Sequence, residues 1–219
     1  MRRKIFLSAC FLLLSCGGQV PQLPKYDMID VSHHQERIDW KQVARFTDNV
    51  YIKATEGKTW VDPMYAKNLE KAKQAGLRVG SYHYLRTTSR VEDQFANFLR
   101  TVPKEKQDLI PMVDCEEQTY WGKKEYVDSL MVFIKLVEKH YGKKPLIYSV
   151  NSFYMKNLQN LQGCPFMIGR YFGYPPVMAP GHSYTLWQYT DKGVIQGIHK
   201  EVDISCFAEG TDVSVLYMN

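Results

Sequence analysis

The alternation of strand and helix patterns along residues 26–158 limits the possible folds more than any other feature of this sequence. Short apolar runs alternate with segments in which apolar residues recur at helical spacing. Strands are predicted at 26–30, 50–54, 77–84, 109–113 and 146–149, and the helices that follow them begin near 39, 62, 89, 125 and 152. Five consecutive strand–helix pairs predict a parallel sheet with its helices on the outside.

Three of the helix starts are predicted from capping residues. Asp39 is expected to cap the first helix, and Pro63 to occupy the first helical position of the second. Ser89 and Glu92 have the spacing of a capping box at the start of the third helix.

The pattern changes after residue 158, where strands follow one another without helices. They are predicted at 166–171, 184–189 and 201–205. Eight strands in one domain predict an irregular α/β barrel of the TIM type, with five βα units followed by about three strands. An open, doubly wound sheet is the alternative. In a barrel of this kind the active site lies at the carboxyl ends of the strands.

The first fifteen residues have the pattern of an export signal. Arg2, Arg3 and Lys4 precede a short apolar run that ends before Cys16. Small residues before a cysteine resemble a bacterial lipobox, so we expect a signal peptide at 1–15, a lipid on Cys16 and a tether at 16–25. Ordinary signal cleavage is the alternative. The catalytic barrel is expected at 26–219.

Charge and cysteine content exclude several classes of protein. The formal charge is +5, but three of the positive charges lie in the signal peptide, so charge gives no reason to expect a nucleic-acid partner. Hydrophobic residues make up 45% and charged residues 23%, which excludes a largely disordered chain. Cys115, Cys164 and Cys206 form no metal-binding motif, and the sequence does not decide whether two of them pair.

Polar or aromatic residues stand where almost every predicted strand ends. Several carboxylates without matching bases are costly to bury, which favours a functional role for the group. The candidates at these positions are Asp30, Glu56, His83, Tyr84, Asp114, Glu116, Tyr148, Arg170, Tyr171, Gln188, Tyr189 and Asp203.

The pair Asp114 and Glu116 is the strongest local signal. Residues two apart on a strand face the same side, with Cα atoms about 6.6 Å apart. Two close carboxyl groups separate in pKa, which leaves one protonated near neutral pH. An acid and an ionised partner are what cleavage of a glycosidic bond requires. A D-x-E pattern is common by chance, however, and on an exposed edge it would be inert.

Two further groups of residues leave alternatives open. His33 and His34 are expected to be solvated loop residues, but with Asp30 and His83 they keep a metal-dependent hydrolase as an alternative. Aromatic residues near strand ends, including Trp187, suit either barrel packing or stacking on sugar rings.

Taken together, these segments resemble the glycoside hydrolases of family 25, lysozymes that cut bacterial peptidoglycan. The resemblance extends from about Tyr26 to Phe207 and rests on motifs in family order. They lie at 29–35, 38–40, 52–57, 61–63, 75–84, 113–116, 144–149, 186–190 and 202–207.

The resemblance implies a role for each carboxylate. Glu116 corresponds to the general acid, and Asp114 to the residue that either assists the substrate's N-acetyl group or attacks directly. Asp30 and Asp203 would line the acidic pocket. The expected sugar contacts are Tyr84, Tyr148, Trp187, Gln188, Glu56, His83 and Tyr171.

The implied reaction is retaining hydrolysis of the β-1,4 bond from N-acetylmuramic acid to N-acetylglucosamine, without metal or other cofactor. The expected partners are peptidoglycan strands and, through Cys16, a bacterial membrane, at its periplasmic or cell-surface face; a monomer is expected. Two departures from the family pattern are Ser205, where asparagine is usual, and Cys115, where an aliphatic residue is commoner. A metal-dependent polysaccharide hydrolase or deacetylase and a non-catalytic glycan-binding lipoprotein are the alternative functions.

Overall fold

The computed structural model describes residues 25–218. The predicted signal peptide, Cys16 and all but the last residue of the predicted tether lie outside the described residues, so their roles remain predictions.

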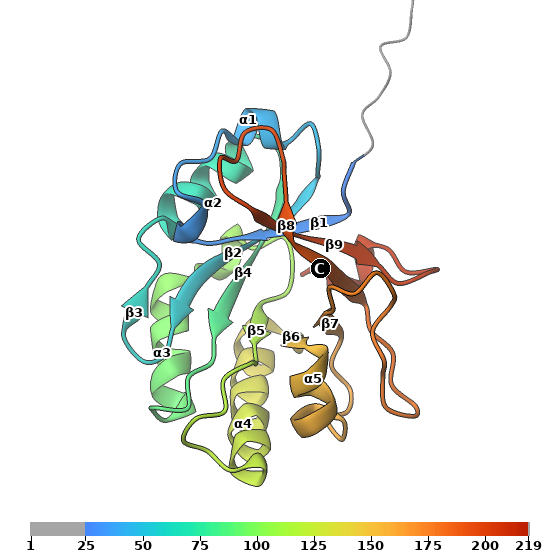
Figure 1. Cartoon of the computed structure of the whole chain (residues 1–219). Helices are drawn as coiled ribbons and strands as arrows, with labels where there is room; N and C mark the ends of the chain where they lie inside the picture. Colours follow the sequence, from blue (N-terminus) through green and yellow to red (C-terminus); the bar gives the residue numbers. More distant parts are fainter. Residues whose placement is uncertain (1–24, 219) are drawn as a thin grey trace, which may run out of the picture.

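Eight strands close into a barrel (Figure 1). Their order around the ring is β1, β2, β4, β5, β6, β7, β8 and β9, and β9 pairs with β1 to close it. All neighbours are parallel except β9, which is antiparallel to both β8 and β1. The bounds are Met28–Val31, Asn49–Glu56, Arg78–Tyr84, Met112–Asp114, Leu146–Val150, Phe166–Gly169, Leu186–Gly193 and Val202–Phe207. The short β3 (Trp60–Val61) pairs only with β2, outside the ring.

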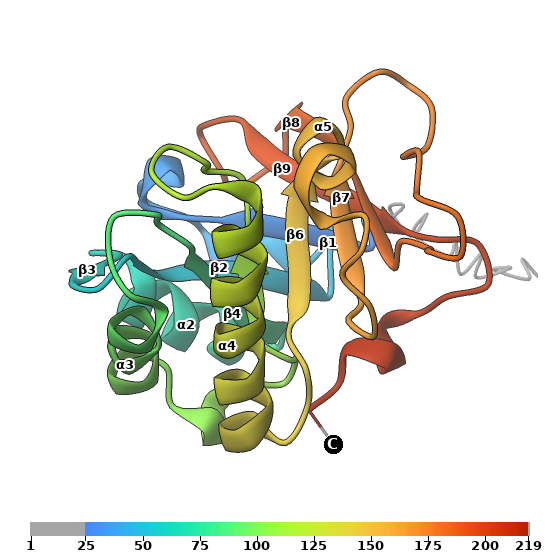
Figure 2. The same cartoon turned by 90° about the horizontal axis from the view of Figure 1, so that it is seen from below.

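A helix follows each of the first five barrel strands. These helices are α1 (Trp40–Val43), α2 (Tyr65–Gln74), α3 (Val91–Thr101), α4 (Lys123–Tyr141) and α5 (Asn151–Phe153), the last continued by a π-helical turn at Tyr154–Leu158. Short 3-10 turns lie at His33–Gln35, Lys104–Lys106 and Val213–Leu216. In the view from below, α2, α3 and α4 lie on the outer surface of the strands (Figure 2). The predicted eight-stranded barrel is confirmed, and the open doubly wound sheet is wrong.

Two of the three predicted helix starts are wrong. Asp39 does cap α1, where its Oδ1 accepts a hydrogen bond from the Gln42 amide at 3.3 Å. The second helix begins at Tyr65 rather than Pro63, because the Asp62 side chain accepts from the Met64 amide in a turn that precedes it.

The capping box at the third helix is absent. Arg90 is the N-cap residue of α3 and makes no side-chain capping bond. The Gln94 side chain instead donates to the Ser89 and Arg86 carbonyl oxygens, at 2.8 and 2.7 Å. The loop before α3 is therefore held by a buried amide from within the helix, which the capping rule does not consider.

Alternation along the strands divides the apolar residues into two cores. One lies between the barrel and the helices and includes Ile52, Val113 and Phe133. The other fills the barrel interior and includes Met28, Tyr51, Tyr82, Met112, Leu146, Met167 and Leu186. Successive side chains point to opposite faces of a strand, so each strand contributes to both. The polar residues at the mouth of the barrel lie directly above this apolar interior.

The thiols of Cys115, Cys164 and Cys206 are free in the structure. Within residues 25–218, no helix combines the length and the apolar character needed to cross a membrane.

Candidate active site

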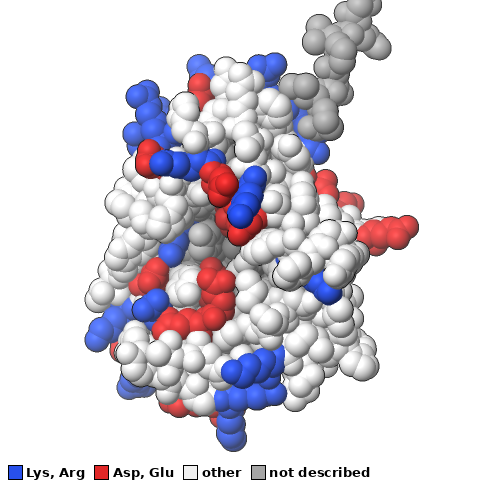
Figure 3. Space-filling view, in the orientation of Figure 1, with Lys and Arg blue, Asp and Glu red and all other residues white. Residues whose placement is uncertain are grey.

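A cavity of about 320 Å³ opens at the carboxyl ends of the parallel barrel strands. Four of the carboxylates expected from the sequence reach it together, although they lie on three different strands and one loop. The lining residues are Asp30, Ser32, His34, Gln35, Lys53, Tyr82, Tyr84, Met112, Asp114, Glu116, Tyr148, Tyr171, Gln188 and Asp203. In the space-filling view, acidic side chains gather around a hollow in this face (Figure 3).

Strand register explains how the carboxylates meet. Asp30 on β1 is paired with Asp203 on β9. Asp114, the last residue of β5, lies between Tyr84 of β4 and Tyr148 of β6. In the parallel strands, the inward position two residues before each of these groups belongs to the interior core, as Met28 does before Asp30 and Met112 before Asp114. The polar groups therefore form one layer over that core.

Asp114 and Glu116 both face the cavity, whereas Cys115 between them is fully buried in the outer core. Oδ1 of Asp114 is buried and has no hydrogen-bond partner among the described residues. A buried carboxylate oxygen of this kind is costly unless it is protonated or meets a ligand.

The environment raises the pKa of all four carboxyl groups. Burial is the largest cause in each case. It raises the pKa of Asp30 to about 7, with the charge of Glu116 adding to it, and that of Asp203 to about 9, with the charge of Asp30 adding to it. The pKa of Asp114 lies well above its ordinary value through burial and the charge of Glu116. Because these groups repel one another when ionised, protons remain in the cluster near neutral pH.

Lys53 is the only Lys or Arg among the described residues that line the cavity. Its ammonium nitrogen lies 2.8 Å from Oε2 of Glu56 and 4.8 Å from the centre of the Tyr84 ring. Its positive charge lowers the pKa of Asp114 and Glu116 against the effect of burial. Lys53 thus favours the ionised form of this pair.

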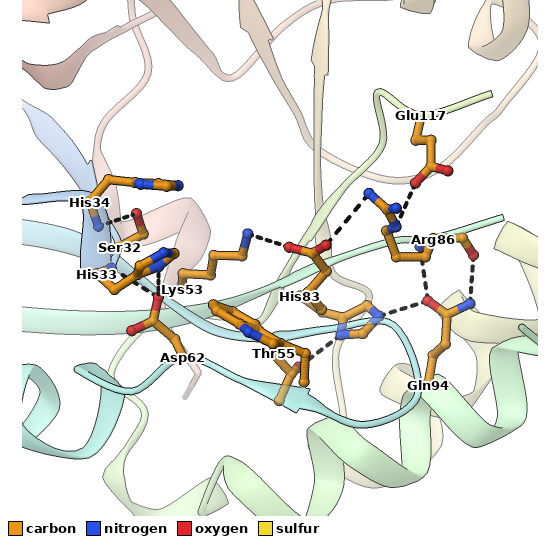
Figure 4. Close-up of polar contacts among 12 residues, drawn as sticks. Ser32, His33, His34, Lys53, Thr55, Asp62, His83, Arg86, Gln94 and Glu117 are labelled. Atoms are coloured by element: carbon orange, nitrogen blue, oxygen red, sulfur yellow. Dashed lines mark hydrogen bonds and ion pairs between the residues drawn. The ribbon is translucent and has the colours of Figure 1, made fainter. Parts of the chain in front are cut away.

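Side chains of alternating charge extend from Lys53 away from the cavity. Glu56 accepts from Lys53 and lies 3.5 Å from Nη1 of Arg86, whose Nε lies 2.8 Å from Oε2 of Glu117. Figure 4 shows Lys53, Arg86 and Glu117 along this chain at the ends of β2 and β4 and the loop after β5.

The opposite side of the mouth is neutral. The Tyr148 and Tyr171 hydroxyls both donate to Oε1 of Gln188, at 2.9 and 2.6 Å. The Gln188 amide nitrogen donates to Oδ2 of Asp30 at 2.9 Å, and this bond lowers the pKa of Asp30 against the effect of burial. Two phenols and an amide are therefore fixed in one orientation beside the carboxylates.

Three of the expected sugar-contacting residues do not line the cavity. His83 is fully buried between barrel and helices, where its ring stacks on Phe133 at 5.0 Å and bonds to Thr55 and Gln94. Burial lowers its pKa to about 4. His83 points outward because Tyr84, its neighbour on β4, points inward.

Trp187 and Glu56 do not line the cavity, for two different reasons. The Trp187 indole faces away from its inward neighbour Gln188 and donates to the Arg170 carbonyl oxygen at 2.8 Å. Glu56 lies behind Lys53 rather than at the cavity wall.

The structure adds lining residues that were not among the candidates. Tyr82 precedes Tyr84 by two positions and so shares its face, a signal that was present in the sequence. Gln35 accepts from the Ser32 amide at 2.8 Å and donates to the Glu201 carbonyl oxygen at 2.9 Å, which ties the loop after β1 to β9. No short stretch of the sequence indicates this long-range contact. Ser205 lies below the mouth on β9, paired with Met28, and its buried hydroxyl has no partner among the described residues.

The histidine pair does not form a metal site. His33 Nδ1 lies 2.9 Å from Oδ2 of Asp62, while His34 lines the cavity. Over residues 25–218, no group of three or more His, Cys, Asp or Glu side chains is placed to hold a metal ion.

Comparison with known proteins gives a consistent result. A sequence profile of "Glycosyl hydrolases family 25" matches residues 29–198. The protein named YegX of Escherichia coli (strain K12) is 37% identical over 186 residues, covering 82% of this chain and 68% of YegX. A protein named "Autolytic lysozyme" of Clostridium acetobutylicum is 31% identical over 185 residues, covering 83% of this chain and 56% of that protein.

A solved structure agrees in fold and sequence. A family 25 glycosyl hydrolase from Bacillus anthracis superposes with a TM-score of 0.77 at 31% identity, covering 84% of this chain and 90% of the other. The matched profile includes Asp30, Asp114 and Glu116 but ends before Asp203.

Proposed function

Because this chain belongs to glycosyl hydrolase family 25, we propose that it is a muramidase that cleaves the β-1,4 bond from N-acetylmuramic acid to N-acetylglucosamine in peptidoglycan. Membership in the family makes the chain a glycoside hydrolase. The bond, the catalytic residues and the stereochemistry are the proposed part.

The observation that supports this proposal most strongly is the convergence of Asp30, Asp114, Glu116 and Asp203 on one cavity. A binding site for a neutral sugar needs hydrogen-bonding groups but no reservoir of protons. Acid-catalysed glycoside hydrolysis needs one carboxylic acid that is protonated near neutral pH and one carboxylate beside it.

We assign the role of acid to Glu116. Its pKa is raised by burial, so it retains a proton that it donates to the oxygen of the leaving sugar as the glycosidic bond breaks. After the leaving sugar departs, the Glu116 carboxylate accepts a proton from the incoming water.

Asp114 acts on the other side of the reacting carbon. It either orients the substrate's own N-acetyl group, whose oxygen attacks the anomeric carbon, or attacks that carbon itself. Both routes pass through a covalent intermediate and retain the anomeric configuration. Lys53 favours the ionised form of Asp114 that each route requires.

The test is release of reducing ends from purified peptidoglycan by wild type, Glu116→Gln and Glu138→Gln. Glu138 is the matched control, because it is exposed on α4 and does not line the cavity. We expect Glu116→Gln to lower the rate about 10²–10⁴-fold and Glu138→Gln to remain near wild type, both with and without a chelator. Equal rates for wild type and Glu116→Gln would contradict the proposal.

We also propose that Cys16 is acylated and that the chain acts as a membrane-anchored monomer. The sequence before Cys16 supports this. Wild type expressed with its signal peptide should incorporate labelled fatty acid, and a Cys16→Ala variant should not. Absence of label from wild type would contradict the anchor.

A further inference from the structure

The exposed aromatic side chains are confined to one face of the described molecule. Five aromatic residues within residues 25–218 are at least 36% exposed: Trp60, Tyr120, Tyr171, Phe172 and Tyr174, with Phe172 the most exposed at 75%. Each follows the carboxyl end of a barrel strand, after β2, β5 or β7. Single exposed aromatics need no explanation, but their confinement to the mouth of the barrel does.

Phe172 and Tyr174, here called the platform, lie exposed in the loop that continues from the cavity wall. Tyr171 lines the cavity and bonds to Gln188, so the next residues lie just outside its wall. Within the ring of barrel strands, β7 and β2 are four places apart, so this platform and Trp60 lie on opposite sides of the mouth.

The loop that presents the platform is braced. The Arg170 guanidinium lies 4.8 Å from the centre of the Tyr174 ring and donates to the Pro175 carbonyl oxygen at 3.1 Å. Asn151 bonds to both the amide and the carbonyl group of Val177, at 3.1 and 2.8 Å. A ring on a fixed loop loses little conformational entropy when it binds a ligand.

The loop also makes its turn at Gly173, between the two rings. Gly173 has φ of +76°, a conformation that other residues rarely adopt. The backbone of this turn is therefore set by the sequence, and the exposed rings on either side of it are held at the rim.

We propose that Phe172 and Tyr174 form an outer subsite that stacks on a sugar ring of the glycan strand, beyond the pair of sugars at the bond that is cut. This inference rests on the proposed function and extends it to the length of the substrate. The cavity of about 320 Å³ is small even for a small-molecule site, so a polymer that enters it must continue over the rim.

The chemistry of the platform fits a sugar ring. Pyranose rings present flat C–H surfaces, which gain dispersion contacts on an aromatic face without requiring a charge. The hydroxyl groups at the ring edge remain in water above an exposed platform. The enzyme should therefore prefer long glycan strands to short fragments.

The experiment compares wild type, Phe172→Ala, the double variant Phe172→Ala/Tyr174→Ala and the control Val215→Ala. Val215 is 52% exposed and lies in the turn Val213–Leu216, whose Leu216 accepts from the Ile110 amide before β5, at the opposite end of the barrel. Each protein is assayed on insoluble peptidoglycan and on the soluble disaccharide of N-acetylmuramic acid and N-acetylglucosamine, which spans only the bond that is cut. Its binding to insoluble peptidoglycan is measured by sedimentation.

For the double variant we expect the KM on peptidoglycan to rise about tenfold with kcat unchanged, and bound protein to fall in proportion. On the two-sugar fragment, which does not reach the outer subsite, its KM should stay within about twofold of wild type. Phe172→Trp keeps an aromatic ring and should have the wild-type KM. Val215→Ala should match wild type in every measurement.

An unchanged KM on peptidoglycan, or an equal rise on the fragment, would overturn the platform. These outcomes differ from failure of the proposed function, in which wild type releases no reducing ends from either substrate. Platform-dependent sedimentation without cleavage would support the subsite and overturn only the reaction. Absence of both cleavage and platform-dependent binding would overturn both.

Discussion

The two sides of the barrel mouth are built from different chemistry. On the side of β2, β4 and β5, Lys53, Glu56, Arg86 and Glu117 form an alternating chain of charges. On the side of β6, β7 and β8, Tyr148, Tyr171 and Gln188 form a neutral network of hydrogen bonds. Both sides flank the same carboxylates.

This difference predicts that the two sides have different roles in the reaction. On the charged side, the positive charge of Lys53 lowers the pKa of Asp114 and Glu116. Neutral hydroxyl, amide and aromatic groups suit the hydroxyl groups and ring faces of a sugar. We therefore expect variants on the charged side to change kcat and its pH dependence, and variants on the neutral side to change KM.

The largest effect is expected between the two sides, at Asp114. Replacing it with Asn keeps the shape but removes the charge, so we expect kcat to fall about 10²–10⁴-fold. The measurement is the initial rate of reducing-end release, with Asp128→Asn, on the exposed surface of α4, as control. A kcat within a fewfold of wild type would remove Asp114 from the mechanism.

A smaller effect, but one diagnostic of the charged side, is expected at Lys53. In Lys53→Met the opposing positive charge is lost, so the pKa values of Asp114 and Glu116 rise further. Both limbs of the pH profile should move to higher pH, and kcat at acidic pH should fall about tenfold. Lys58→Met, an exposed neighbour on the β2–β3 turn, should keep the wild-type profile. A pH profile of Lys53→Met with both limbs unchanged would contradict the proposed role of the charged side.

On the neutral side, Tyr171→Phe should have a milder effect. The change removes the hydroxyl that donates to Gln188 at 2.6 Å but keeps the ring. We expect KM to rise about threefold, in line with the loss of one hydrogen bond, with the pH profile unmoved. A shifted pH profile with unchanged KM would contradict the assignment of substrate binding to the neutral side and of pH dependence to the charged side.

The smallest effect is on stability, at Asp203. Its pKa is about 9 in the folded protein and near 3.8 when unfolded, so the folded state binds the extra proton between these values. Stability is therefore lost as pH rises through this window. Asp203→Asn should raise Tm by a few degrees at pH 8 and leave it nearly unchanged at pH 4.

Thermal unfolding of both proteins at the two pH values checks this prediction. Asp128→Asn serves again as control, because Asp128 is exposed and its effect should not grow with pH in this way. An equal gain at pH 4 and pH 8 would mean that the carboxyl group of Asp203 is not held protonated in the folded state.

The architecture was predictable because periodicity is a local property. The five strand–helix pairs and the three final strands were each visible in a short window of sequence. Helix starts were less predictable, since the α3 terminus depends on the Gln94 side chain and the α2 terminus on the turn made by Asp62.

Two of the three expected residues that do not line the cavity, His83 and Trp187, share one cause. They stand at strand ends next to Tyr84 and Gln188, but adjacent residues of a strand face opposite sides. Position along a strand therefore predicts a site residue only together with the side that it faces. The link from Glu56 to Arg86 and the contact of Gln35 with Glu201 join distant segments, and no short window of sequence contains them.

The proposed mechanism depends on proton donation by Glu116 to the leaving sugar, and a change of leaving group tests this step most directly. Wild type and Glu116→Gln should be compared on peptidoglycan and on a peptidoglycan disaccharide with a 4-nitrophenyl leaving group, which departs without a proton. Because Glu116 also serves as the base of the second step, the rate compared on the aryl glycoside is that of the first equivalent of 4-nitrophenol released. We predict that Glu116→Gln loses about 10²–10⁴-fold on peptidoglycan but releases this first equivalent at close to the wild-type rate. An equal loss in both measurements would contradict the assignment of Glu116 as the acid.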